Sequence, residues 1–301
     1  MNVDYDREKN TVTVVIDDVT DLLNVQVHPK HQARHDACEE GHKRSGDGAF
    51  FWGEDFRSRK GIEEACEDGW DKGLKQLREV IDDLDLKVKG IGRRRRKSFS
   101  DMGDDIDMQK VYGGQLDTAW DSFKMVQDST RPKSVTIAVG ILAHCGVNSK
   151  DFFWRGATAL LIADALQTAG ISVRIIGYCI SERVWAGPKA PRIIRQQWTV
   201  KDHGEHLDME RLTFMLCSGG FARHYTFKVK ESYVYTDGDV RSTYGYPRHE
   251  DWWGEVEGES VINIEDIWSE AACRQFIADL LRREDIGKVF VREETKSWNF
   301  A

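Results

Sequence analysis

The segment that decides the fold is Val135–Ala143, VTIAVGILA, which follows Pro132. A nearly continuous apolar run of this length is typical of a strand that is covered on both faces, as in a parallel sheet. Asp151–Ala169 carries alanine and leucine at helical spacing, and Gly170 stands where a glycine would end that helix. Ser172–Ile180, SVRIIGYCI, predicts a second strand. Strand, helix and strand within about 45 residues predict a βαβ unit, with two parallel strands and a right-handed crossover.

Strand-like and helix-like segments continue to alternate beyond this unit. We expect strands at Ile193–Val200, Tyr225–Val234, Val261–Ile264 and Val289–Val291, and helices at Leu207–Cys217 and Asp266–Arg283. Such alternation predicts a three-layer α/β domain over residues 131–301, with a mostly parallel, Rossmann-like sheet.

Residues 1–130 have a different pattern, and we expect them to form an α+β extension that wraps or extends the α/β domain. Thr11–Ile16, TVTVVI, is rich in β-branched residues and predicts a strand. Ile62–Leu86 carries apolar residues at three- and four-residue steps and predicts a charged helix, which two glycines weaken and could split. Leu116–Val126 predicts a further short helix.

The composition excludes several classes of protein. The chain has 301 residues, of which 40% are hydrophobic and 31% charged, as in a globular protein with a sizeable core. Acidic residues outnumber basic ones by 51 to 43, so a general polyanion binder is not expected. No apolar segment resembles a membrane span or a secretory signal, so we expect a cytoplasmic protein without a membrane partner. The six cysteines form no C-x-x-C pair and are interpreted as structural thiols in a reducing compartment.

Rare residue types recur in order across residues 46–290. They are Trp52-Gly53, Glu64-Ala65, Gly69-Trp70, Gly73, Arg93–Arg96, Asp104–Asp107, Gly113-Gly114, Trp120, Trp154–Ala157, Ala163–Leu166, Ala169-Gly170 and Val173. This order resembles an uncharacterised family that is encoded by tailed bacteriophages and some actinobacterial genomes. The resemblance implies a phage-type protein, located in the host cytoplasm or on the virion, and it implies no activity.

The βαβ unit also resembles the opening of a von Willebrand factor A-like domain. The metal site of that fold begins with an Asp-x-Ser-x-Ser stretch directly after the first strand. This chain has Ala143–Ser149, AHCGVNS, at that place, and its next acidic residue is Asp151. The resemblance therefore implies the topology and does not extend to the Mg²⁺ site.

Polar residues follow both strands of the βαβ unit, where α/β folds place their ligands. One hypothesis is a pocket for an anion, in which the guanidinium near the start of the helix would clamp a phosphate or carboxylate. The alternative, which we favour, is that this arginine pairs with an acidic neighbour and the residues before the helix only cap it. The five residues concerned are His144, Asn148, Ser149, Arg155 and Glu182.

The sharpest metal-like spacing lies between residues 28 and 42. Histidine and cysteine, both Zn²⁺ ligands, recur there at steps of three and four, which would place them on one face of a helix. Five ligands on one helix cannot converge tetrahedrally, so we favour a solvated polar helix or loop. The residues are His28, His31, His35, Cys38 and His42.

His203 and His206 form a second and weaker metal candidate, with Glu205 or Asp202 nearby. The spacing H-x-x-H alone is unspecific. The alternative is that these residues provide polarity at the start of the helix predicted from Leu207.

Arg93–Lys97, RRRRK, is the only dense basic run. Arg93, Arg94, Arg95, Arg96 and Lys97 could dock phosphates of a nucleic acid. Because the net charge is −8, we favour the alternative that they stay solvated or neutralise the acidic residues of Asp101–Asp107.

An aromatic segment follows at residues 244–254. Aromatic side chains dominate interface hot spots, so an exposed part of this segment is an interface candidate. Its members are Tyr244, Tyr246, Trp252 and Trp253.

The leading hypothesis is a non-enzymatic, phage-type module for protein interaction or assembly, built on a von Willebrand A-like domain. Its partner would be a phage or host protein or a second copy, and it would use no cofactor. It rests on the lack of G-x-x-x-x-G-K, G-x-S-x-G and H-E-x-x-H motifs. One alternative is a hydrolase or nuclease with a Zn or Mg ion, and the other is nucleic-acid binding through Arg93–Lys97. The hydrolase would use His144, Glu182, His203 and His206.

Overall fold

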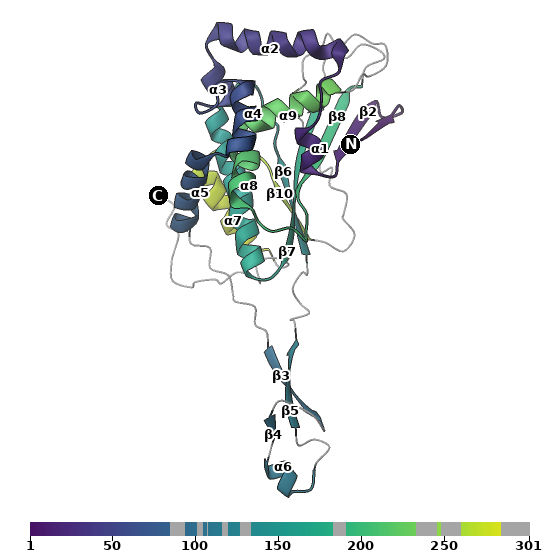
Figure 1. Ribbon diagram of the computed structural model, residues 1–301, viewed down its shortest axis with the longest axis vertical. Helices are drawn as coiled ribbons and strands as arrows, with labels where there is room; N and C mark the ends of the chain where they lie inside the picture. Colours follow the sequence, from purple (N-terminus) through teal and green to yellow (C-terminus); the bar gives the residue numbers. More distant parts are fainter. Residues whose placement is uncertain are drawn as a thin grey trace.

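The computed structural model describes residues 1–84, 94–100, 105–106, 108–115, 120–126, 134–182, 191–232, 246–247 and 260–283. These residues form an α/β body, built on one large sheet, and a second, small sheet (Figure 1). The strands of the body are β1 (Asn2–Asp6), β2 (Thr11–Ile16), β6 (Ser134–Gly140), β7 (Ser172–Glu182), β8 (Ile193–Lys201), β9 (Tyr246–Pro247) and β10 (Ser260–Ile264). Its helices are α1 (Val19–Leu23), α2 (Gln32–Ser45), α3 (Gly48–Trp52), α4 (Arg59–Asp68), α5 (Asp71–Leu84), α7 (Phe153–Thr168), α8 (Met209–Cys217), α9 (Gly219–Ser232) and α10 (Glu270–Leu280). The short 3-10 helices η1 (Pro29–His31) and η3 (Ser149–Phe152) precede α2 and α7.

The predicted βαβ unit is confirmed. β6 and β7 pair in parallel, from Ser134 opposite Ser172 to Gly140 opposite Tyr178, and α7 connects them. α7 is buried along almost its whole length because it lies between the sheet and α8. Gly156 permits this close packing, since a Cβ atom there would lie 2.3 Å from the carbonyl oxygen of Leu216.

The large sheet is mixed, whereas a mostly parallel sheet was predicted. Its order is β1-β2-β8-β7-β6-β10, and β9 pairs with the end of β7. The pairs β6–β7, β10–β6 and β2–β8 are parallel, and β1–β2, β7–β8 and β7–β9 are antiparallel. β8 runs against β7 because only residues 183–192 separate them, and a parallel return needs a crossover of about a dozen residues or more.

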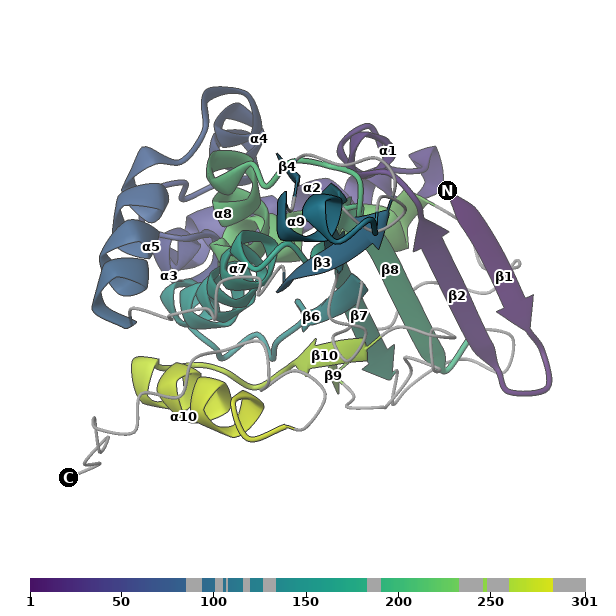
Figure 2. The same cartoon turned by 90° about the horizontal axis from the view of Figure 1, so that it is seen from below.

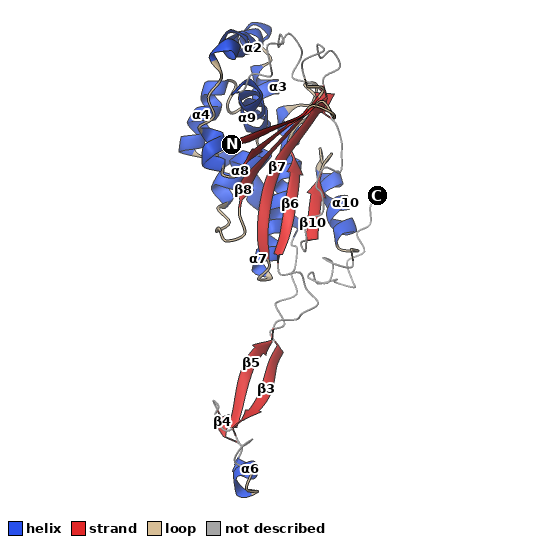
Figure 3. Ribbon diagram, turned by 90° about the vertical axis from the view of Figure 1, so that its right-hand side faces the viewer, coloured by secondary structure: helices blue, strands red, loops and turns tan. Residues whose placement is uncertain are grey.

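Apart from α2, which has no buried residue, the described helices of the body share one core with one face of the sheet. Figures 2 and 3 show α7, α8 and α9 on that face. In the described residues the body thus has two layers, where three were predicted. The opposite face carries a smaller buried cluster, which includes Ala138, Ile176 and Tyr178. Burial on both faces explains why β6 and β7 appear in the sequence as nearly continuous apolar runs.

The N-terminal region enters the same body. β2 pairs with β8, and Val12, Val14 and Ile16 lie in the shared core. The helix predicted over residues 62–86 is split into α4 and α5 at Gly69, which has a φ of +85°. The domain boundary near residue 130 stays a prediction.

Two element predictions were wrong. Tyr225–Val234 was predicted as a strand, but its residues up to Ser232 belong to α9. α9 is buried on nearly all sides, so it shows no helical apolar stripe and its alternation is accidental. Leu116–Val126 was predicted as a helix, but β5 (Trp120–Val126) is a strand there, because it pairs with a segment about 25 residues earlier in the chain.

The small sheet contains β3 (Arg94–Ser100), β4 (Asp105–Ile106) and β5, in the order β3-β5-β4. It carries the short helix α6 (Met108–Tyr112) beyond β4. We call the small sheet and α6 the arm. In Figures 1 and 3 the arm projects from the end of the body opposite α2.

The remaining element predictions have two outcomes. The strands and helices predicted at 193–200, 207–217, 261–264 and 266–283 are confirmed with small changes of bounds. The strand predicted at Val289–Val291 lies outside the described residues.

All six cysteines are free, and Cys145 is the exposed one. None of the described helices has the length and apolar character that a membrane crossing requires.

Candidate functional sites

Residues 141–148 form the loop that follows β6, and two buried arginines hold it. Arg155, from the first turn of α7, donates from Nη1 to the carbonyl oxygen of Leu142 over 3.4 Å. Arg223, from α9, donates from Nη2 to the carbonyl oxygen of Val147 over 2.5 Å, and from Nη1 to that of Phe51 over 2.6 Å. Both arginines are 3% exposed, so the loop conformation is fixed from inside the body.

Aromatic rings support both guanidinium groups. Arg155 and Arg223 lie on Phe152, with Cζ 5.1 and 5.0 Å from the ring centre. Arg155 also stacks on Trp268 at 4.3 Å and Arg223 on Phe51 at 4.3 Å. Burial lowers the pKa of Arg155 to about 9 and that of Arg223 to about 10. Both remain cations at neutral pH, and their hydrogen bonds go to backbone carbonyl groups.

The residues of the predicted anion pocket have separate partners. Asn148 accepts from the Lys150 amide over 3.2 Å and caps η3, as the capping alternative expects. Ser149 donates to the Ala49 carbonyl oxygen over 3.3 Å. The exposed His144 accepts from the Gly146 amide at Nδ1 over 3.1 Å. Glu182 pairs with Arg192 at 2.7 Å. For Arg155, Glu265 and Asp266 favour the charged form.

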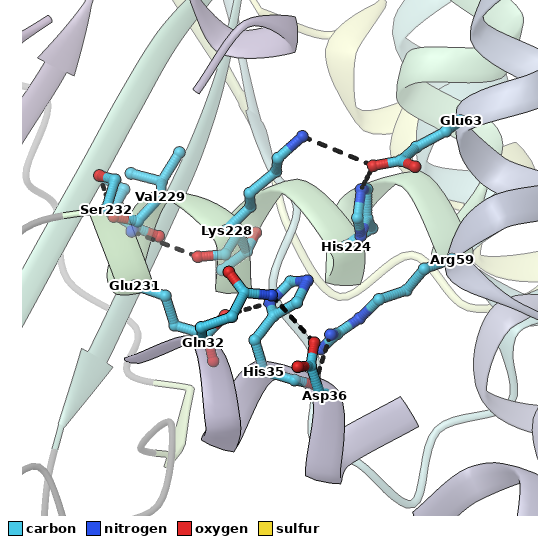
Figure 4. Close-up of polar contacts among 12 residues, drawn as sticks. Gln32, His35, Asp36, Arg59, Glu63, His224, Lys228, Val229, Glu231 and Ser232 are labelled. Atoms are coloured by element: carbon cyan, nitrogen blue, oxygen red, sulfur yellow. Dashed lines mark hydrogen bonds and ion pairs between the residues drawn. The ribbon is translucent and has the colours of Figure 1, made fainter. Parts of the chain in front are cut away.

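A second polar cluster joins α2, α4 and α9 (Figure 4). Nδ1 of His35 lies 2.5 Å from Oε2 of Glu231, and Arg59 donates to the His35 carbonyl oxygen over 2.6 Å. Two turns earlier on the same face of α9, Nε2 of His224 lies 3.2 Å from Oε1 of Glu63, which also pairs with Lys228 at 3.5 Å. The rings of His35 and His224 are 6.4 Å apart, so the two histidine–carboxylate pairs form one cluster, in which His224 and Glu231 are buried and Glu63 is exposed.

The electrostatics of this cluster favour a neutral His224. Burial lowers the pKa of His224, although its hydrogen bond to Glu63 acts in the opposite direction. That same hydrogen bond lowers the pKa of Glu63 to about 2. Nε2 of a neutral His224 therefore donates to an ionised Glu63, and its Nδ1 has no hydrogen-bond partner among the described residues. The same holds, within the described ranges, for Nε and Nη2 of Arg59. The cluster fastens α2 to the body through charged and polar contacts.

The predicted metal residues of the first segment are distributed over η1 and α2. His28 caps η1, His31 is buried, and His35 belongs to the cluster just described. Cys38 is half-buried, and burial raises the pKa of its thiol. His42 pairs with Asp47 at 2.8 Å and stacks on Phe51 at 4.0 Å.

Over the part of the chain that the structure describes, no three His, Cys, Asp or Glu side chains are grouped so as to hold a metal ion. His206 is exposed, and the carbonyl oxygen of His203 accepts from Ser172 over 3.0 Å. Within the described ranges, neither of the two metal sites proposed from the sequence therefore has three such side chains placed together.

The basic run lies in the arm. Arg94, Arg95, Arg96 and Lys97 are consecutive residues of β3, and Arg93 lies outside the described residues. Tyr246 belongs to β9. The other members of the aromatic interface candidate, Tyr244, Trp252 and Trp253, lie outside the described residues.

The sequence analysis missed Arg59, Glu63, Arg223, His224 and Glu231. Arg223 and His224 were overlooked because α9 was predicted as a strand. The signal that could have shown the helix is the repeat of polar residues at positions 224, 228 and 231, three to four residues apart, which is helical spacing.

Comparisons with known proteins give one match. The family described as "Domain of unknown function (DUF7192)" matches residues 4–288, which is most of the chain. No curated protein and no solved structure matches.

Proposed function

We propose that this chain, which belongs to the DUF7192 family, is a non-enzymatic module for protein interaction or assembly of the phage type. In this proposal the body is a variant of the Rossmann-like, von Willebrand A-like fold. The parallel β6–α7–β7 unit supports that relationship. The mixed sheet makes it a distant one.

The observations that support this proposal concern the arm. Its strands form a sheet of their own, and α6 presents Tyr112 with 82% exposure and Met108 with 47%. These are the two largest exposures among the described large apolar side chains. An exposed tyrosine on a projecting element is typical of a surface that a partner covers, because aromatic residues contribute most to interface hot spots.

The test uses the full chain as bait in cells that produce it, with cross-linking and mass spectrometry to map contacts. Tyr112→Ser should reduce recovery of the cross-linked protein at least fivefold, because the buried aromatic anchor is lost. Phe50→Ser is the matched control, since Phe50 is 38% exposed on the body. A strictly monomeric protein that cross-links to nothing through residues 94–126 would contradict the proposal.

Nucleic-acid binding is the second candidate function, and one observation favours it. The basic run lies on an antiparallel two-stranded ribbon, β3 with β5, and the major groove of DNA admits such a ribbon. Replacing Arg94, Arg95 and Arg96 by alanine should lower both the affinity and its salt dependence in filter binding. An absence of binding at low salt would remove this candidate.

A further inference from the structure

We propose that the arm binds a second copy of this chain by strand addition, with β3 of one copy pairing to the open edge of β1 in the next. This inference rests on the proposed assembly function and names the partner. It is carried by two sheet edges of opposite charge, one on the body and one on the arm, that have no neighbouring strand among the described residues.

β1 is the edge of the large sheet. It pairs with β2 on one side, and no described strand lies on its other side (Figure 2). An edge strand presents unpaired N–H and C=O groups that can pair with another chain. Met1 and Val3 are each 46% exposed, so the side chains of this edge are uncovered as well.

The β1 edge is acidic. Asp4 is exposed, and its carboxylate has neither a hydrogen bond nor an ion pair within the described part of the chain. Asp6 accepts at Oδ1 from the amides of Glu8 and Lys9, both at 3.0 Å, which holds its carboxylate at the end of the strand. Asp4 and Asp6 share one face of the sheet, whereas Tyr5 between them packs against the core.

The β3 edge is basic. Among the described strands β3 pairs with β5 alone, so no described strand covers its other edge. Four consecutive basic residues, Arg94–Lys97, occupy this strand, and both faces of the ribbon therefore have basic positions. β4 contains two residues, so most of the arm's sheet is the two-stranded ribbon of β3 and β5, which is marginally stable in water and would gain stability from an added strand.

Antiparallel pairing of the two edges matches their charges. With Asp4 opposite Arg96, Asp6 falls opposite Arg94, which gives two cross-strand pairs of opposite charge on one face. Pairing β3 with a second β3 would set basic residues against basic residues. Pairing β1 with a second β1 would set aspartates against aspartates. The acidic edge also excludes a nucleic acid as the ligand of β1.

Such a contact joins two different surfaces of the same chain. A heterologous contact of this kind propagates into an open chain or closes into a ring, according to the rotation between copies. The inference therefore specifies assembly of several copies.

The test is sedimentation of the purified full chain over a range of protein and salt concentrations. The wild type should form species heavier than the 34.5 kDa monomer at low salt, and salt should dissociate them. Asp4→Arg and Arg96→Asp should each weaken association at least tenfold, because each sets like charges opposite one another. Glu8→Arg is the matched control, since it makes the same charge change in the turn after β1 and should associate like the wild type.

Mixing the two variants is the decisive step. Arg96→Asp protein keeps a wild-type β1, and Asp4→Arg protein keeps a wild-type β3, so the mixture should form heavier species that neither variant forms alone. The inference is overturned if the mixture stays monomeric, or if the wild type is monomeric at every concentration. If the wild type is monomeric but Tyr112-dependent cross-links to another protein persist, this inference fails and the proposed function stands. If nucleic acid copurifies and only Arg96→Asp removes it, nucleic-acid binding replaces the inference.

Discussion

α7 and α9 lie in the same layer and are both buried, but their burial has different chemistry. α7 buries apolar residues such as Leu160 and Ile162, both with no exposed surface. α9 buries Arg223, His224 and Glu231, each at most 3% exposed. Apolar burial requires only a complementary shape, whereas each buried polar group also requires a partner. For α9 those partners come from distant segments, namely the carbonyl groups of the 141–148 loop and side chains of α2 and α4.

The largest effect should come from breaking the apolar packing of α7. Leu160→Ala removes a fully buried side chain and leaves a cavity, which should lower the free energy of unfolding by about 2–5 kcal/mol. Urea unfolding monitored by circular dichroism measures this change. Asp164→Ala, on the exposed side of the same helix, is the control and should change stability by less than about 0.5 kcal/mol. Equal effects of the two would show that α7 does not pack as described.

A smaller effect is expected from the polar packing of α9. Arg223→Met keeps most of the side-chain volume but leaves the carbonyl groups of Phe51 and Val147 without this donor. An unsatisfied buried acceptor costs about 1–3 kcal/mol, so stability should fall by about that amount. Hydrogen exchange should also accelerate locally in residues 141–148, because Arg223 fixes that loop. Arg211→Met, on the exposed surface of α8, should leave both measurements unchanged.

A further, pH-dependent effect should come from protonating His224. Because its pKa lies below the ordinary 6.5 in the folded protein, the unfolded chain binds more protons as pH falls below that value. Stability is thus complete above pH 6.5 and declines on acidification, by at most about 1.4 kcal/mol per pH unit for this one group. Urea unfolding between pH 7.5 and 5 measures the slope. His224→Gln should flatten it, and His206→Gln, at an exposed site, should not.

Glu63 predicts a second decline at lower pH. Its pKa of about 2 in the folded protein lies below the ordinary 4.5, so its contribution is present above pH 4.5 and is lost as pH falls towards 2. In Glu63→Gln this acid-dependent loss should shrink, whereas in Glu64→Gln, its exposed neighbour, it should persist. A wild type without any loss of stability between pH 4.5 and 2 would contradict the assignment.

Local patterns were sufficient for β6, α7, β7, α8, β8 and β10. Their apolar runs and periodicities come from burial within each element, so they are visible in a short window of sequence. The capping role of Asn148 was equally local, because an N-cap side chain reaches an amide only two or three residues away. The anion pocket could not be judged in this way, because the partners of His144, Ser149 and Glu182 depend on which segments meet.

By itself, the sequence determined the βαβ unit, the strands β2, β8 and β10, and the helices α8 and α10. The tertiary structure alone decided that α9 is a helix, that β5 is a strand, that β8 runs against β7 and that Arg59, His224 and Glu231 meet between three helices. The physical reason is the separation along the chain of the residues that set each feature. Apolar spacing records the burial of one element, whereas strand direction, strand partners and the pairing of buried charges depend on residues far away in the chain.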